Sequence, residues 1–127
     1  MDESDHFSAL AKRLTHVMAV ELDRRLRVHN VTLAQWGVLK QLWEREGRSQ
    51  VELQGRMGLE GATVTGLLQR MIRAGLVQRR TDPSDKRVQR VFLTEQGRAL
   101  ETVVAHLVEE INAQALAGFT ADEQVFI

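Results

Sequence analysis

The chain has 127 residues, enough for one domain with a real core but too few for two. Its hydrophobic fraction of 43% and charged fraction of 27% are ordinary for a globular protein, which excludes the disordered and fibrous classes. Cysteine is absent from the sequence, which excludes a disulfide framework, thiolate metal ligands and thiol-based redox sensing. Neither a signal-peptide pattern nor a membrane span is present, so we expect a cytoplasmic protein with no membrane partner.

The formal net charge is zero, with 17 basic and 17 acidic residues, but the charges are unevenly distributed. Basic residues concentrate between Thr63 and Arg98, and the residues after Arg98 include no lysine or arginine. A phosphate backbone needs only a local basic patch, so overall neutrality does not argue against DNA binding.

Periodic apolar residues predict the first two helices. Apolar positions recur at three- and four-residue steps from Phe7 to Leu26, which indicates a long amphipathic helix over residues 5–28. Thr32 and Gln35 have the spacing of a capping box and begin a second helix, which we expect to end at Gly47. Trp36 and Trp43, seven residues apart on that helix, are expected in the core.

A helix-turn-helix pattern follows. Ser49 and Glu52 form a second capping box, which predicts a short helix to about Met57 that buries Val51, Leu53 and Met57. After a turn at Gly58, a further helix runs to Ala74, followed by Gly75 in the left-handed stop position. The inward positions of that helix are expected to be Val64, Leu67, Leu68, Met71 and Ile72.

The C-terminal third predicts a hairpin and another long helix. Residues 76–80 and 88–93 are short β-prone runs on either side of a turn-rich loop, which indicates an antiparallel hairpin, the wing. Helix resumes at Thr94 and continues to about Leu116, and Thr120 with Glu123 suggests the start of one more helix. The predicted fold is mainly α with a small β-hairpin: a winged helix-turn-helix flanked by long terminal helices.

Several segments together resemble the MarR family of bacterial transcription regulators. The most specific is the wing, aspartate-proline-x-aspartate-basic-arginine at residues 82–87, followed by Leu93-Thr94 and a glycine. Residues 32–36, 52–59, 63–65 and 75–77 also match the pattern, so the resemblance covers nearly the whole chain.

The resemblance implies a single domain over residues 1–127 that forms a homodimer. Residues 5–29 and 94–127 would be dimerisation helices, and residues 32–93 the winged helix-turn-helix, with the wing at 76–93. Such dimers bind pseudo-palindromic operators in double-stranded DNA. They commonly repress, and commonly release DNA when a small, often aromatic or anionic, effector binds.

The sequence departs from the family pattern in two places. Gly61, Ala62 and Gly66 occupy positions of the second helix of the motif that are often polar or basic in the family. Gly66 costs about 1 kcal/mol relative to alanine inside a helix. Family members usually carry a complete C-terminal helix that interlocks with the partner, whereas here that helix is barely started. Dimerisation is then expected to rest on the 5–28 and 94–116 helices, unless the chain is a truncated form.

The candidate DNA-binding residues lie on the second helix of the motif and on the wing. On the helix, five polar residues lie off the apolar stripe: Thr63, Thr65, Gln69, Arg70 and Arg73. At the wing tip, Arg87 is a candidate for the minor groove and Lys86 for a phosphate. Asp85 suits an orienting partner of Arg87, as the resemblance also implies, or a turn-forming residue.

Other functions have weaker support in the sequence. Arg13 and Trp36 are candidates for an effector pocket, although an exposed arginine and a core tryptophan are the simpler interpretations. The four histidines lack ligand spacing, and no nucleophile-base pair or phosphate loop is apparent, so we predict no metal, no cofactor and no enzyme. The main alternative is a winged-helix module for protein interaction without specific DNA binding. A redox or metal sensor of similar fold is a weaker one, and the absence of cysteine and the scattered histidines count against it.

Overall fold

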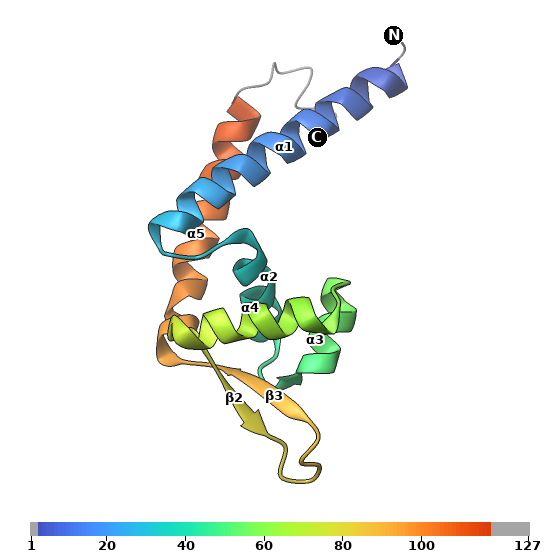
Figure 1. Ribbon diagram of the computed structural model, residues 1–127. Helices are drawn as coiled ribbons and strands as arrows, with labels where there is room; N and C mark the ends of the chain where they lie inside the picture. The colour runs from blue at the N-terminus through green and yellow to red at the C-terminus, as the bar shows by residue number, and fades with distance from the viewer. Residues whose placement is uncertain (1–2, 118–127) are drawn as a thin grey trace. The chain divides into compact units, whose positions relative to one another are not determined.

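The structure is a computed structural model that describes residues 3–117, so the helix start suggested at Thr120 lies outside the described residues (Figure 1). By its internal contacts the chain divides into two units. Of the described residues, the terminal unit comprises 3–30 and 103–117, and the central unit comprises 31–102. None of the helices over the described residues is both long and apolar enough to cross a membrane.

The terminal unit contains helix α1 (Glu3–Val28) and most of helix α5 (Glu95–Ala117). The helix predicted over 5–28 is confirmed and begins two residues earlier. Acidic residues lie in its first turn and Arg25 and Arg27 in its last, which complements the helix dipole. Arg25 also joins the two helices, donating to a Glu110 carboxylate oxygen at 2.8 Å and to the side-chain oxygen of Gln114.

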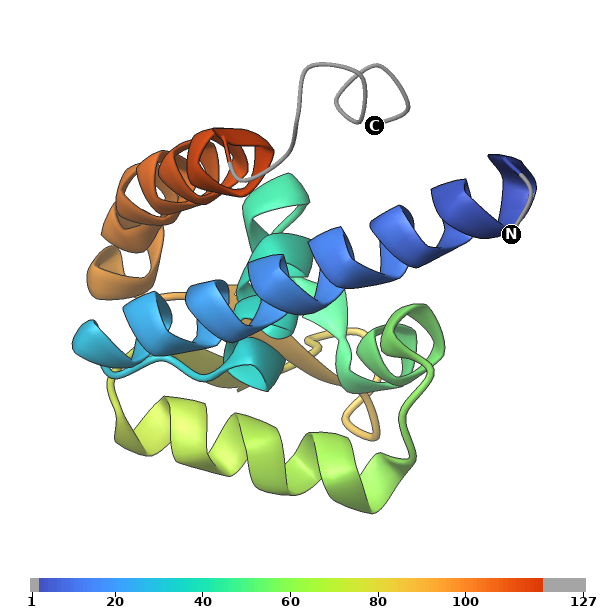
Figure 2. The same ribbon diagram turned by 90° about the horizontal axis from the view of Figure 1, so that it is seen from above.

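The central unit consists of three helices and a small sheet. The helices are α2 (Leu33–Glu44), α3 (Gln50–Met57) and α4 (Gly61–Arg73), and α4 follows α3 after a short connection (Figure 2). The strands β1 (Arg48–Ser49), β2 (Val77–Thr81) and β3 (Gln89–Leu93) form an antiparallel sheet in the order β1-β3-β2. The predicted hairpin is confirmed, and Figure 1 shows it projecting beyond α3 and α4.

The two predicted capping boxes that lie within the described residues are confirmed. The Thr32 hydroxyl accepts a hydrogen bond from the Gln35 backbone N–H, and the Gln35 side-chain oxygen accepts one from the Thr32 backbone N–H. Ser49 and Glu52 make the same reciprocal pair at the start of α3. Gly75 has φ +77°, so the predicted left-handed stop after α4 is also confirmed.

The third strand was not predicted from the sequence. β1 has only two residues, too short for an alternating pattern, and pairs Arg48 with Val91 and Ser49 with Arg90. The expected end of the second helix at Gly47 was wrong, because α2 stops at Glu44. Gly47, at φ +79°, instead makes the turn into β1, where its amide donates to the Val91 carbonyl at 2.9 Å.

The buried side chains of the central unit come from all three helices and from the sheet. They include Val38, Leu39, Leu42, Leu53, Val64, Leu68, Met71, Leu76, Val77, Val91 and Leu93. Two expected core residues were wrong: Val51 is 75% exposed and Ile72 is 38% exposed. The two tryptophans, expected in the core, are only half-buried. Trp43 donates its indole N–H to the Gly97 carbonyl at 2.9 Å, and Trp36 lies beneath the Lys40 ammonium.

Candidate nucleic-acid interface

Helix α4 presents a polar face opposite its apolar one. Val64, Leu67, Leu68 and Met71 are buried, whereas four of the five predicted DNA-contacting residues are exposed: Thr63, Gln69, Arg70 and Arg73. Arg70 and Arg73 lie in the last turn, where positive charge complements the helix dipole. The helix therefore offers both amide and guanidinium groups to a ligand on that side.

The fifth residue, Thr65, has an internal partner. It is half-buried, and its hydroxyl accepts a hydrogen bond of 2.6 Å from the Gln50 side chain of α3. The bond fixes α4 against the first turn of α3. Gly66, one position on, is also half-buried, and a Cβ there would meet the Arg70 guanidinium at an ordinary distance of 3.4 Å. Packing within the chain therefore does not require glycine at this position.

The segment between β2 and β3, residues 82–88, is the wing loop. Two aspartate side chains shape it, because each accepts a hydrogen bond from the backbone N–H two residues further on. Asp82 accepts from Ser84 at 2.7 Å, and Asp85 accepts from Arg87 at 3.0 Å. The Asp82 amide donates to the Val88 carbonyl at 2.9 Å and closes the loop. These turns leave Lys86 and Arg87 exposed at the tip.

Asp85 has both of the roles considered from the sequence, as a turn-forming residue and as a partner that orients Arg87. Besides forming the turn, it holds the Arg87 guanidinium in a two-point contact, Nε–Oδ1 at 3.0 Å and Nη2–Oδ2 at 3.1 Å. This bond holds the pKa of Asp85 below its usual range. The Arg87 side chain is nevertheless 89% exposed. A fully solvated guanidinium in a fixed orientation is ready to contact an external anion.

Arg90, also on the wing, was not among the candidate DNA-binding residues named from the sequence. It lies on β3, directly opposite Arg80, an unfavourable like-charge pair on neighbouring strands. The structure separates the two charges: the Arg80 guanidinium lies 4.4 Å from the centre of the Phe92 ring, and Arg90 turns to Asp82 at 2.7 Å. Its partners became apparent only with the hairpin register.

An open groove of about 510 Å³ lies between α3 and the wing. Val51 and Gln54 line it on the α3 side, and Arg87, Val88 and Gln89 on the wing side. The exposed position of Val51, expected in the core, follows from this opening. The wing loop is therefore not packed against α3 through apolar side chains at this place.

Arg13 and Trp36, the candidates for an effector site, lie in separate units, on α1 and α2. The Lys40 ammonium is 4.4 Å from the centre of the Trp36 ring, a cation–π contact within one helix. Over the described residues, no three histidine, aspartate or glutamate side chains gather in a way that would hold a metal ion.

A helix-turn-helix followed by a β-hairpin that projects beside its second helix defines a winged helix-turn-helix domain. Residues 31–88 match the model of the MarR family. The chain belongs to the MarR family, whose members are transcriptional regulators and not enzymes.

Known relatives agree with this assignment. The chain is 38% identical over 96 residues to the HTH-type transcriptional regulator TtmR of Methylorubrum extorquens (strain PA1), a match that covers 76% of this chain and 48% of TtmR. This chain thus spans about half the length of that curated relative. Among solved structures, wild-type MarR from E. coli in its apo form superposes with a TM-score of 0.78 and 27% identity, covering 91% of this chain and 87% of that one.

A third comparison is a probable transcriptional regulator from Pseudomonas aeruginosa. It is 31% identical, with a TM-score of 0.69, and the match covers 92% of this chain and 84% of the other. The predicted fold class and the predicted family are therefore confirmed.

Proposed function

We propose that this protein is a transcriptional regulator that binds double-stranded DNA as a homodimer, with α4 facing the major groove and the wing tip the adjacent backbone or minor groove. The observation that carries the proposal is the pairing, within one unit, of an exposed polar face on α4 with a solvated arginine held by an aspartate. Membership of the MarR family supports it.

The contacts divide into positioning and base-reading groups. Arg70, Arg73, Lys86 and Arg87 supply the charge that phosphates attract. Gln69 is suited to a bidentate pair with adenine, and Thr63 to either a base or a phosphate. Because α4 carries small residues where base-reading side chains would stand, we expect phosphate and wing contacts to supply more of the affinity than base contacts.

A homodimer is supported by the apolar side chains that the terminal unit exposes. They include Phe7, Val17, Val20 and Leu116, which are between 36% and 52% exposed. A second copy would remove them from water. Two wings and two α4 helices then read half-sites about one helical turn apart, so the operator is pseudo-palindromic.

Repression relieved by a small anionic or aromatic effector completes the proposal. Arg79 on β2 supports an anionic ligand, because its Nε and Nη2 atoms are buried and have no hydrogen-bond partner among the described residues. Benzoate is a simple probe. A ligand that binds only the native state raises the melting temperature, so a thermal-shift titration of the wild type and Arg79→Gln tests this part.

DNA binding is tested by fluorescence anisotropy with labelled duplexes that tile the promoter region of the protein's own gene, at low salt and with unlabelled competitor. We expect at least one duplex to bind far more tightly than mixed-sequence DNA of equal length. Equal affinity for all duplexes would remove sequence-specific regulation from the proposal. No binding to any duplex would favour a protein-interaction module instead.

A further inference from the structure

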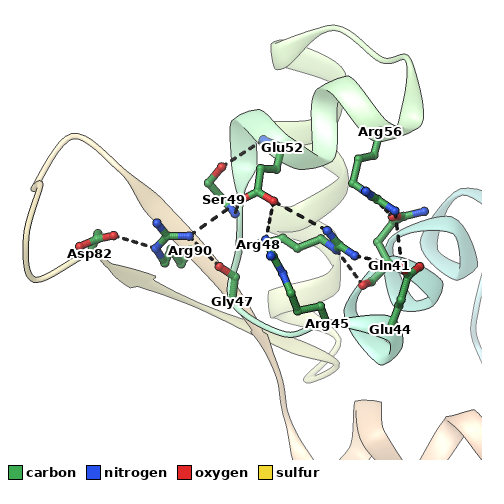
Figure 3. Close-up of polar contacts among 10 residues, drawn as sticks. All are labelled: Gln41, Glu44, Arg45, Gly47, Arg48, Ser49, Glu52, Arg56, Asp82 and Arg90. Carbon is green, nitrogen blue, oxygen red and sulfur yellow. Dashed lines mark hydrogen bonds and ion pairs between the residues drawn. The ribbon is translucent and has the colours of Figure 1, made fainter.

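Arg90 joins three separate segments of the central unit (Figure 3). Its Nε donates to the Asp82 carboxylate of the wing loop at 2.7 Å. Its Nη1 donates to the Gly47 carbonyl, in the turn before β1, at 2.9 Å, and lies 3.8 Å from the Glu52 carboxylate of α3. One guanidinium thus contacts the wing loop, the turn and the first turn of the helix-turn-helix.

Glu52 continues the connection into the helices. Besides capping α3 through the Ser49 amide, it accepts from Arg45 at 2.8 Å and lies 3.7 Å from Arg48. Arg48 is 4% exposed and donates to the Gln41 carbonyl of α2 at 3.0 Å. The carboxylate that receives Arg90 is therefore itself fixed to α2 and to the start of α3.

The same turn of α3 also fixes α4. Gln50, next to Ser49 at the start of the helix, donates to Thr65 of α4. The wing and α4 are therefore both connected to the first turn of α3, the wing through Arg90 and α4 through Gln50. Elsewhere the wing loop is shaped by its own Asp82 and Asp85 turns, and the groove separates it from α3.

We propose that Arg90 is a positioning residue, which holds the wing loop at a fixed place relative to the helix-turn-helix so that Arg87 and α4 meet one duplex together. The inference rests on the proposed DNA-binding function. In this proposal Arg90 acts through Asp82 and Glu52, because its Nε and Nη1 are engaged within the protein. Free in solution, the wing is already in its binding position, which lowers the cost of ordering it.

The substitution Asp82→Asn separates positioning from simple electrostatics. Asparagine keeps the side-chain oxygen that accepts the Ser84 amide, so the turn persists, but the charge that attracts Arg90 is lost. Removing a negative charge near DNA strengthens binding if only net charge matters. Loss of positioning weakens it, so the two explanations predict opposite signs.

The first measurement is the affinity for a labelled mixed-sequence duplex at low salt, because wing and phosphate contacts do not depend on sequence. We expect Asp82→Asn and Arg90→Gln each to weaken binding about three- to tenfold, the range of one charge-assisted hydrogen bond that is partly exposed. The double variant should be no weaker than the worse single variant, because both remove the same connection. Arg90→Lys, which retains the charge but cannot reach both Asp82 and Gly47, should fall between wild type and Arg90→Gln.

Two matched controls accompany these variants. Arg24→Gln removes an arginine from an exposed pair with Glu21 on α1, outside this network, and should leave binding within about twofold. Glu101→Gln removes an exposed carboxylate outside the wing and measures the effect of charge alone. Thermal unfolding of every variant confirms that each is folded.

The second measurement is independent of DNA. Amide hydrogen exchange at Asp82 and Val88 reports opening of the wing loop, because both amides are bonded within it. We expect Arg90→Gln to accelerate exchange there about tenfold and Arg24→Gln to leave it unchanged. Unchanged exchange in Arg90→Gln, or tighter DNA binding by Asp82→Asn, would overturn the proposal. If the wild type binds no duplex, the proposed function itself fails, and the exchange data still show whether Arg90 holds the loop.

Discussion

Replacing Arg87 with alanine gives the most direct test of the wing. The guanidinium is 89% exposed and its only described side-chain partner is Asp85, so Arg87→Ala should leave the melting temperature almost unchanged. Each phosphate contact contributes a slope of about −0.9 to the plot of log affinity against log salt. A homodimer has two wings, so the variant should flatten the slope by about 1.8.

That change in slope sets the size of the effect. Over a fourfold rise in salt, one contact is worth a factor of about 3.5 in affinity and two contacts a factor of about 12. Fluorescence anisotropy between about 50 and 200 mM salt measures it. The control is Arg24→Ala, which removes the same charge from an exposed arginine of α1, paired there with Glu21 at 2.7 Å. An unchanged slope in Arg87→Ala, or an equal change in Arg24→Ala, would refute the role of the wing tip, and a change near 0.9 would argue for a single wing on the DNA.

The remaining predictions concern the loop, a helix cap and a helix junction. The hydrogen bond from Arg90 holds the pKa of Asp82 below its ordinary value of 3.8. The contact therefore orders the loop fully above pH 3.8, and this order is lost as the pH falls through the lowered pKa. In an NMR titration of the Asp82 carboxyl, Arg90→Gln should move the midpoint up towards 3.8. Ser49→Ala removes the side-chain cap of α3 and should lower the free energy of unfolding by about 1 kcal/mol in urea, an expectation that a value near zero contradicts. Gly97→Ala should cost about 3 kcal/mol in the same assay, because its Cβ would overlap the Leu76 carbonyl oxygen. Wild-type stability would show that the junction can move.

Those parts of the fold that depend on local chemistry were predictable. Capping boxes at Thr32 and Ser49 depend on residues three apart, and the left-handed stop at Gly75 depends on one glycine, so the sequence alone indicates them. The Asp85–Arg87 pair is equally local. Each of these features was confirmed, and each depends on partners only a few residues apart along the chain.

Features that depend on distant partners were not predictable in the same way. Val51 has helical spacing for burial, but the groove beside the wing leaves it exposed. β1 exists because Val91 and Arg90 offer an open strand edge to Arg48 and Ser49, more than forty residues away along the chain. The Arg90–Asp82 contact follows only from the hairpin register. A periodic pattern identifies a face, whereas the tertiary arrangement decides what covers that face.

The glycine in the leucine-threonine-x-x-glycine segment has a structural reason of this second kind. The Thr94 hydroxyl accepts the Gly97 amide at 3.1 Å and so begins α5, while the Thr94 amide donates to the Leu76 carbonyl at 3.0 Å. These bonds bring the Leu76 carbonyl against the Cα of Gly97, where no side chain fits. The motif therefore fastens β2 to the start of α5, a structural role distinct from DNA contact.

The charges of the wing loop are the reason why, in the proposed DNA binding, we expect its position to matter more than its charge density. Residues 82–88 contain Asp82, Asp85, Lys86 and Arg87, two negative and two positive side chains, so the loop has no net charge. A loop that attracted phosphates by charge alone would not retain two carboxylates beside its cations. Both carboxylates instead bind arginines, Asp85 at the tip and Asp82 at the base. The loop therefore attracts phosphates weakly over long range, but it presents the pre-ordered guanidinium of Arg87. Part of the side-chain entropy of Arg87, up to about 2 kcal/mol in total, is then already lost before the proposed binding to DNA. We therefore expect such a wing to contribute to the proposed DNA binding through one contact at a defined place. A single substitution at Asp82, at the base of the loop, should then weaken that binding despite removing a repulsive charge.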